Sequence, residues 1–152
     1  MAGFFFDTSA VVKFYHIEAG TPAVQNILNA AGNALRSSRL TIAELISAFA
    51  IKVRTQVISR QDADLFRLQF RHDIATGRLA VFSVGEPEFA LAESLLERNA
   101  FDFHLRALDA IQLAVAIGLR TGGLVDHFVT ADKTLCQVAG REGFLVINPE
   151  EI

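Results

Sequence analysis

Four acidic residues occupy positions from which a carboxylate can do chemistry. Two closely follow short apolar runs and two lie early in long apolar runs: Asp7, Asp132, Glu44 and Asp109. Carboxylates held close together repel one another, and each raises the pKa of its neighbours. Divalent cations relieve that repulsion, and an all-oxygen set of ligands favours Mg²⁺ or Mn²⁺ over zinc. The four acids are therefore candidate metal ligands and candidate catalytic residues.

Such a site suits displacement reactions at phosphorus. Two cations about 4 Å apart can activate water and stabilise both the attacking and the leaving oxygen. No histidine or lysine base is then needed, and the four histidines lack the paired spacing of a helical zinc site. The hydroxyl groups beside the acids, on Thr8, Ser9 and Thr130, are candidates for positioning water or a phosphate oxygen. Capping of the helices that follow them is an equally good explanation.

Each acid also has an ordinary explanation. Asp is a favoured helix N-cap, and helical patterns begin near both Asp7 and Asp132. Glu44 and Asp109 are harder to explain in this way, because apolar residues surround them and charged side chains are rarely buried without a partner. For these two the alternative is a surface stripe or a salt bridge, since Arg106 precedes Asp109 by three residues. Taken together, the four acids favour a shared site over four independent caps.

Short β-branched or aromatic runs alternate with helical patterns along the chain. The runs predict strands at residues 4–6, 33–38, 79–83, 126–130 and 144–147. The helical patterns predict helices at residues 9–15, 21–31, 40–53, 59–76, 86–98, 106–119 and 132–141. This alternation is typical of an α/β fold whose parallel sheet is covered on both faces, with ligands bound beyond the carboxyl ends of the strands. The helices at 40–53 and 106–119 are apolar nearly all round, which predicts that both are buried.

Length and composition predict one compact domain over residues 1–152. Apolar residues make up 51% of the chain, which excludes a disordered protein. The single cysteine, Cys136, cannot form an internal disulfide and is expected to be a small buried hydrophobe and not a nucleophile. The amino end lacks the basic region of a signal peptide, and no apolar run approaches the roughly 20 residues that span a membrane. We therefore expect a cytoplasmic protein that does not enter the membrane.

Charge is unevenly distributed along the chain, although the formal net charge is only −3. Residues 34–78 hold eight basic and four acidic side chains, whereas residues 79–152 hold five basic and eleven acidic ones. Most of the basic residues are arginines, whose planar guanidinium suits phosphate and carboxylate groups. The basic segment is either an ordinary solvated pair of helices or a surface that faces phosphate, and the sequence favours neither.

Four segments resemble, in order, the successive motifs of PIN domains. They are Phe4-Phe-Phe-Asp7-Thr-Ser-Ala, Leu40-Thr-Ile-Ala-Glu44-Leu, Leu105-Arg-Ala-Leu-Asp109-Ala-Ile-Gln-Leu-Ala and Phe128-Val-Thr-Ala-Asp132-Lys-Thr-Leu. The closest resemblance is to the VapC-like toxins of toxin–antitoxin pairs, and it extends to the closing Val146-Ile-Asn-Pro. It implies a three-layer α/β/α sandwich with a central parallel sheet. It also implies a Mg²⁺- or Mn²⁺-dependent endoribonuclease toxin of a type II system, with RNA as substrate and Asp7, Glu44, Asp109 and Asp132 as its acidic quartet.

The same resemblance implies a homodimer and inhibition by a cognate antitoxin protein. We expect an Arg or Lys of that antitoxin to enter the acidic pocket, because carboxylates attract a guanidinium or ammonium group strongly. Two departures from the family's pattern matter here. No further acid stands beside Thr130 and Ala131, so a second metal is expected to be held weakly. Asp126 lies at the amino end of its strand and not after it, so it is not expected to be a ligand.

Three alternatives stay open at the level of sequence. A haloacid-dehalogenase-like phosphatase would need an acid where Ser9 stands and a later acidic pair. A receiver-like domain, which accepts a phosphoryl group and signals by binding, would need neighbouring acids after the first strand. The third alternative is a catalytically silent PIN-like module that only binds protein, and the intact quartet of acids speaks against it.

Overall fold

Five parallel strands form the sheet at the centre of the structure. The computed structural model describes residues 2–151. In chain order the strands are β1 (Gly3–Phe6), β2 (Ala34–Ser38), β3 (Ala80–Phe82), β4 (His127–Val129) and β5 (Leu145–Ile147). Their order across the sheet is β3-β2-β1-β4-β5, and every neighbouring pair is parallel. The predicted parallel sheet is confirmed.

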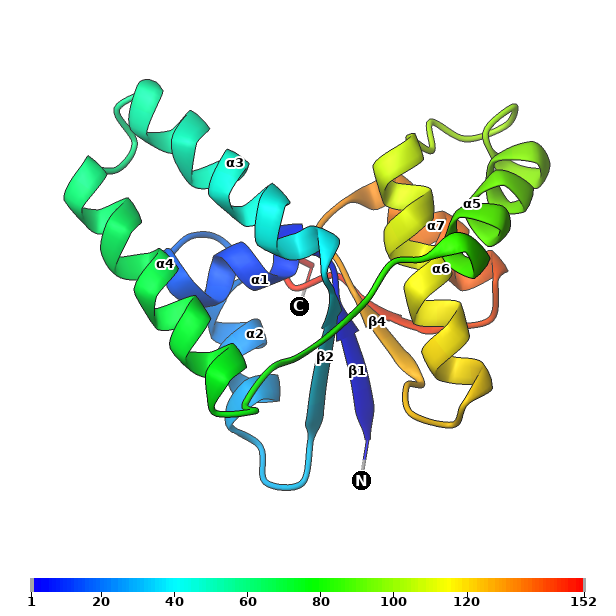
Figure 1. The fold of residues 1–152 in the computed structure, drawn as a ribbon, viewed down its shortest axis with the longest axis horizontal. Coiled ribbons are helices and arrows are strands. Elements are labelled where there is room, and N and C mark those ends of the chain that lie inside the picture. The colour runs from blue at the N-terminus through cyan, green and yellow to red at the C-terminus, as the bar shows by residue number, and fades with distance from the viewer. Residues whose placement is uncertain (1, 152) are drawn as a thin grey trace.

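Helices cover both faces of this sheet. They are α1 (Thr8–Tyr15), α2 (Thr21–Asn29), α3 (Leu40–Arg54), α4 (Arg60–Ala75), α5 (Glu86–Asn99), α6 (Ala107–Thr121) and α7 (Lys133–Arg141). Figure 1 shows α1 to α4 on one side of the strands and α5 to α7 on the other, so the expected α/β/α sandwich is confirmed. Within residues 2–151, none of the helices combines the length and apolar character needed to cross a membrane.

The three consecutive phenylalanines of β1 divide the interior into two cores. Successive side chains of a strand point to opposite faces of its sheet. Phe5 packs among buried residues of α5, α6 and α7, whereas Phe4 and Phe6 pack with α1, α3 and α4. Because β1 is buried on both faces, a polar side chain can emerge from it only at its ends. Asp7 stands at the carboxyl end.

One prediction about burial is wrong. The sequence predicts that α3 is buried all round, but only one side of this helix is covered. Leu45 and Phe49 are buried in the core shared with α1 and α4, whereas Ile46 and Ile51 are 38% and 48% exposed. Figure 1 shows the reason, because α3 and α4 project away from the sheet as an antiparallel arm. The similar helix α6 is buried along most of its length, as predicted.

The strand order creates a switch point between β1 and β4. The chain moves outward from β1 to β2 and β3, then returns to the other side of β1 for β4 and β5. Crossovers in the two directions place helices on opposite faces, and in folds of this kind ligands bind beyond the carboxyl ends of the strands at such a switch point. Asp7 and Asp132 follow these two strands, and α3 and α6 bring Glu44 and Asp109 to the same edge.

Candidate metal centre and active site

Asp7 is the buried member of the quartet and the N-cap of α1. Its Oδ1 accepts hydrogen bonds from the Ser9 hydroxyl (2.7 Å) and the Ala10 amide (3.1 Å). Its Oδ2 accepts the Thr130 hydroxyl at 2.6 Å. The cap interpretation is therefore correct, but it accounts for only part of these contacts. Among residues 2–151, no cationic side chain forms an ion pair with this carboxylate.

Burial raises the pKa of Asp7 from 3.8 to about 6. The hydrogen bonds from Thr130, Ser9 and Ala10 act in the opposite direction, and the nearby charge of Asp109 adds a smaller upward effect. The ionised carboxylate of Asp7 is thus desolvated, and all its hydrogen-bond donors are uncharged. A carboxylate in this condition gains more from a nearby cation than an exposed one does.

Glu44 is oriented by a buried polar network. Its Oε1 accepts hydrogen bonds from the Thr8 hydroxyl and from Gln112 Nε2, both at 2.8 Å. The Gln112 amide also donates to the hydroxyls of Thr8 (3.1 Å) and Thr41 (3.0 Å). Sequence reasoning missed Gln112, which is only 2% exposed. The signal was available, because it is the one amide in the apolar run of α6 and follows Asp109 by three residues.

Asp109 and Asp132 share a single cation, Arg106. The Arg106 Nε donates to Asp109 Oδ2 at 3.0 Å, and its Nη2 lies 3.5 Å from Asp132 Oδ2. The salt bridge considered for Asp109 is therefore present, and it extends to a second acid. The other oxygen of Asp132, Oδ1, caps α7 by accepting the Leu135 amide at 2.9 Å. Asp132 is thus a helix cap through one oxygen and lies near Arg106 with the other.

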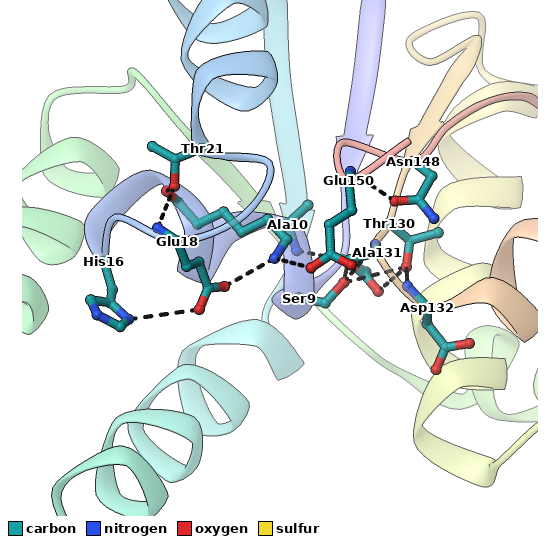
Figure 2. Close-up of polar contacts among 12 residues, drawn as sticks. Ser9, Ala10, His16, Glu18, Thr21, Thr130, Ala131, Asp132, Asn148 and Glu150 are labelled. Carbon is teal, nitrogen blue, oxygen red and sulfur yellow. Dashed lines mark hydrogen bonds and ion pairs between the residues drawn. The ribbon is translucent and has the colours of Figure 1, made fainter. Parts of the chain in front are cut away.

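Hydroxyl groups orient Glu44 and Asp7, and we call the four acids together with Thr8, Ser9 and Thr130 the acidic site. Thr8 donates to Glu44, while Ser9 and Thr130 donate to Asp7. Thr130 also accepts the backbone amide of Asp132 at 3.1 Å, and Figure 2 shows Ser9, Thr130 and Asp132 side by side. The structure therefore places the three predicted hydroxyls where they orient the acids. Direct contact of these hydroxyls with water or phosphate stays a prediction.

The carboxylate oxygens of the acidic site are suitable ligands for a hard divalent cation, but the four side chains do not converge on a single point. Within residues 2–151, no three side chains of Asp, Glu, His or Cys are close enough together to hold a metal ion as they stand. Arg106 supplies the test of fit, because its guanidinium already stands between two of the acids as a cation. Oxygen ligands of this kind suit Mg²⁺ or Mn²⁺. For three or more of the acids to hold one cation together, their side chains would have to move closer to one another.

Other candidate groups lie outside the acidic site. Asp126 is at the amino end of β4, where it accepts the Gly3 amide (3.2 Å) and pairs with His127 (2.7 Å), so it is not placed to be a ligand. Cys136 is half-buried, and burial raises the pKa of its thiol to about 11. A thiol of this kind is not a nucleophile at neutral pH, as expected from the sequence.

Most side chains of the basic segment 34–78 have partners within the chain. Five of the eight are hydrogen-bonded or ion-paired: Arg36, Lys52, Arg60, Arg67 and Arg78. Ion pairs on an exposed helix pair are the ordinary solvated arrangement. Among residues 2–151, Arg39, Arg54 and Arg71 form no ion pair, so they are the members still available to an outside anion.

A second cluster of charges adjoins α1, and we call it the balanced cluster. It consists of Lys13, Glu18, Lys52 and Glu150. Lys13 Nζ lies 3.0 Å from Glu18 and 2.7 Å from Glu150, and Lys52 Nζ lies 2.9 Å from Glu18. Figure 2 shows Glu18 and Glu150 pointing toward each other across this contact. The cluster ties the carboxyl-terminal segment to α1.

The chain belongs to the PIN domain family, whose model matches residues 4–141. Solved structures share the fold at low sequence identity. FitAcB from Neisseria gonorrhoeae is 17% identical with a TM-score of 0.65, and the match covers 98% of this chain and 99% of that one. A toxin–antitoxin complex from Klebsiella pneumoniae is 16% identical with a TM-score of 0.60 and full coverage of both chains. VapBC2 from Rickettsia felis, bound to a DNA fragment from its promoter, is 14% identical with a TM-score of 0.60 and covers 96% and 98%.

No curated protein sequence matches the chain. PIN domains are generally nucleases that use divalent metal ions, and this membership speaks against the phosphatase and receiver alternatives. At 14–17% identity the structural likeness establishes the fold alone.

Proposed function

We propose that the chain is a divalent-metal-dependent endoribonuclease and the toxin of a type II toxin–antitoxin pair. One observation carries the proposal. In a PIN fold, four carboxylates are located near the carboxyl ends of the central strands, and Arg106, which pairs with Asp109 and Asp132, is the one cation paired with any of them among the described residues. We assign Asp7, Glu44, Asp109 and Asp132 as catalytic metal ligands, and Mg²⁺ or Mn²⁺ as the cofactor. Placing carboxylates near one another costs electrostatic energy, and a catalytically silent binding module would gain nothing in return.

The cation, when bound, supplies a Lewis acid that activates water and stabilises charge at the scissile phosphate. The protein's part is to hold and orient. Burial keeps Asp7 in surroundings of low dielectric constant, where its attraction for a cation is strong. Thr8 and Gln112 fix Glu44 through one carboxylate oxygen. Asp132 is anchored through its capping oxygen, so its Oδ2 is held toward the site at little entropic cost.

The proposal is tested by incubating the purified protein with a structured RNA in Mn²⁺ and then in excess EDTA. We expect cleavage in Mn²⁺ and none in EDTA. A DNA of the same sequence, treated in parallel, decides whether RNA is preferred. Glu44→Gln serves as the inactive control for contaminating nuclease, because it keeps the size of the side chain and removes its charge. Cleavage that persists in EDTA, or equally in this variant, would refute the metal mechanism.

The toxin role adds a cognate antitoxin protein and a cytoplasmic location to the proposal. It is supported by the toxin–antitoxin complexes among the structural neighbours. The α3–α4 arm supports it further, because its apolar side chains Ile46, Ile51, Leu65 and Leu68 are exposed where a partner can cover them. We expect expression of this chain alone to slow growth of the host, and a small protein encoded beside it to restore growth. If expression is harmless and the neighbouring gene encodes no such protein, the toxin role is wrong.

We also propose that the chain forms a homodimer. Large apolar side chains around α5 and the start of α6 stand in solvent, with Phe101 91% exposed and Phe89 and Leu108 each 48% exposed. Aromatic residues are enriched at protein interfaces. Light scattering should give twice the mass of the 16.6 kDa chain. A monomer at all concentrations would remove the dimer from the proposal and leave the nuclease untouched.

A further inference from the structure

Arg106 occupies the N-cap of α6, where helix chemistry disfavours an arginine. Favoured N-cap side chains accept hydrogen bonds from the free amides of the first turn, and a guanidinium has no acceptor. Its positive charge also lies at the positive end of the helix dipole. The side chain of Arg106 accordingly makes no capping hydrogen bond. Stability of α6 therefore does not explain why an arginine stands there.

The contacts of Arg106 point instead to the acidic site. Its guanidinium reaches across to both Asp109 (3.0 Å) and Asp132 (3.5 Å), which belong to different helices. The pKa of Arg106 is raised, first by the hydrogen bond and charge of Asp109 and further by the charges of Asp132 and Glu44. Burial opposes the rise. Three of the four acids thus act on this one side chain.

We propose that Arg106 is an intramolecular counter-ion that a divalent cation must displace from Asp109 and Asp132 in order to bind. This inference rests on the proposed function, because it takes these two acids as metal ligands. The guanidinium contacts Oδ2 of both residues, and Oδ1 of Asp132 is already engaged in capping α7. A divalent cation bound to the same Oδ2 atoms would lie within a few ångströms of the positive guanidinium, and the two like charges would repel each other.

The exposure of Arg106 makes displacement feasible. Its side chain is 64% exposed, so the displaced guanidinium can move into water without leaving a buried charge behind. An exposed ion pair is worth little and is screened by salt, and the resulting competition is modest. The acids therefore have a partner when no cation is bound, and they exchange it for a divalent ion at small cost.

Arg98 provides a matched control. It is also a half-exposed arginine in an ion pair, but its carboxylate partner is Glu142, which is not a member of the acidic site. Replacing either arginine by glutamine removes one positive charge from the molecule. Only Arg106→Gln removes that charge from the oxygens of the proposed metal ligands.

The experiment is a calorimetric titration of each protein with Mn²⁺ at low and at high ionic strength. We expect Arg106→Gln to bind Mn²⁺ roughly three- to fivefold more tightly than wild type at low salt, the scale of one exposed ion pair. Arg106→Lys should fall between the two, because a point charge cannot span both acids as the planar fork does. Arg98→Gln should bind as wild type does. The advantage of Arg106→Gln should shrink at high salt.

Three other outcomes decide against the idea in different ways. Equal or weaker Mn²⁺ binding by Arg106→Gln overturns the inference while leaving the metal site in place. Equal tightening in Arg106→Gln and Arg98→Gln shows a general effect of net charge and also overturns it. If wild type and all variants bind no Mn²⁺, the proposed function itself has failed.

Discussion

The two charged clusters beside α1 are built on opposite principles. The balanced cluster pairs two lysines with two glutamates, whereas in the acidic site Arg106 pairs with Asp109 and Asp132, and the described residues offer Asp7 and Glu44 no ion pair. The pKa values reflect the difference. Burial alone would raise the pKa of Glu18, but hydrogen bonds from Lys52 and Lys13 outweigh it and the pKa is lowered. At Asp7 the donors are neutral, burial prevails, and the pKa is raised.

This difference shows which cluster is complete without a ligand. A carboxylate with a lowered pKa is more stable in the folded chain than in water, so the balanced cluster stabilises the fold at neutral pH. A carboxylate with a raised pKa lowers the stability of the folded chain at neutral pH. A cation that binds the carboxylate can offset this loss of stability. Substitutions in the two clusters should therefore have opposite effects on stability and on activity.

The largest expected difference lies in cleavage. Asp7→Asn and Asp109→Asn should each lower metal-dependent RNA cleavage by about a hundredfold or more, the scale of losing one charge from a catalytic site. The carboxamide keeps the shape of the side chain and removes the charge that holds the cation. Glu150→Gln makes the same chemical change in the balanced cluster and should leave cleavage within about twofold of wild type. Initial rates on one labelled RNA measure all three, and near-wild-type cleavage by either Asp variant would remove that residue from the site.

The second prediction concerns the stability of the metal-free protein. The pKa of Asp7 rises from 3.8 to about 6 on folding, so between these pH values the folded chain binds more protons than the unfolded chain. The contribution of Asp7 to the stability of the wild type is therefore greatest below about pH 4, and it is lost as the pH rises through about 6. The loss amounts to roughly 3 kcal/mol at most, from about two pKa units. Asp7→Asn lacks this loss and should be more stable than wild type at pH 7 in EDTA.

Urea unfolding of both proteins from pH 4 to pH 8 measures the effect. The difference between the two curves isolates Asp7, because every other titrating group is common to both. We expect the curves to diverge between about pH 4 and pH 6 and to run parallel above. Curves that stay parallel throughout would mean that Asp7 carries no electrostatic cost, and the contrast between the clusters would lose its basis.

The balanced cluster should respond in the opposite direction. Lys13→Met keeps the buried aliphatic stem and leaves Glu18 and Glu150 without their shared cation, whose side chain is only 5% exposed. We expect a destabilisation of about 2 kcal/mol at pH 7, below the cost of breaking a fully buried pair because both glutamates retain access to water. Chemical denaturation gives the value, and cleavage per folded molecule should be unchanged. A stabilised variant would mean that the ion pairs contribute nothing net.

Local chemistry made the strand ends and helix starts predictable from sequence. An apolar run followed by Asp7-Thr-Ser contains a strand end and an N-cap together, and the helix predicted from residue 59 begins with a capping box between Ser59 and Asp62. The acidic edge followed because parallel strands expose their carboxyl ends together. These inferences need only a few adjacent residues.

Features that depend on distant partners were not predictable. The contact of Arg106 with Asp132 joins the starts of two helices that the sequence separates by 26 positions, and only the nearer contact with Asp109 follows from helical spacing. Gln112 stands out in the sequence as the one amide of its apolar helix, but its contact with Glu44 depends on where α3 places that acid. The burial of α3 was misjudged for a related reason. An apolar face indicates that something covers it, and a pattern cannot distinguish the chain's own core from a partner protein.

The smallest expected effect is at Asp132, which combines both roles in one side chain. Its Oδ1 caps α7, and its Oδ2 faces Arg106 within the acidic site. Losing the cap in Asp132→Ala should cost about 1 kcal/mol. Removing one of several mutually repelling charges should offset part of that cost in EDTA. Asp132→Asn is the matched variant, because an amide oxygen still caps the helix while the charge is lost.

Melting temperatures across a Mn²⁺ titration separate the two roles of Asp132. A ligand that binds only the folded state raises stability according to its concentration relative to its dissociation constant. If Oδ2 is a ligand, the thermal shift produced by Mn²⁺ should shrink in both Asp132→Ala and Asp132→Asn, although only the alanine variant loses the cap. If Asp132 is a cap alone, Asp132→Asn should behave as wild type does and Asp132→Ala should lose stability equally with and without Mn²⁺. That second pattern would reduce the metal ligands to Asp7, Glu44 and Asp109. Arg106 would then be paired with only one metal ligand, Asp109.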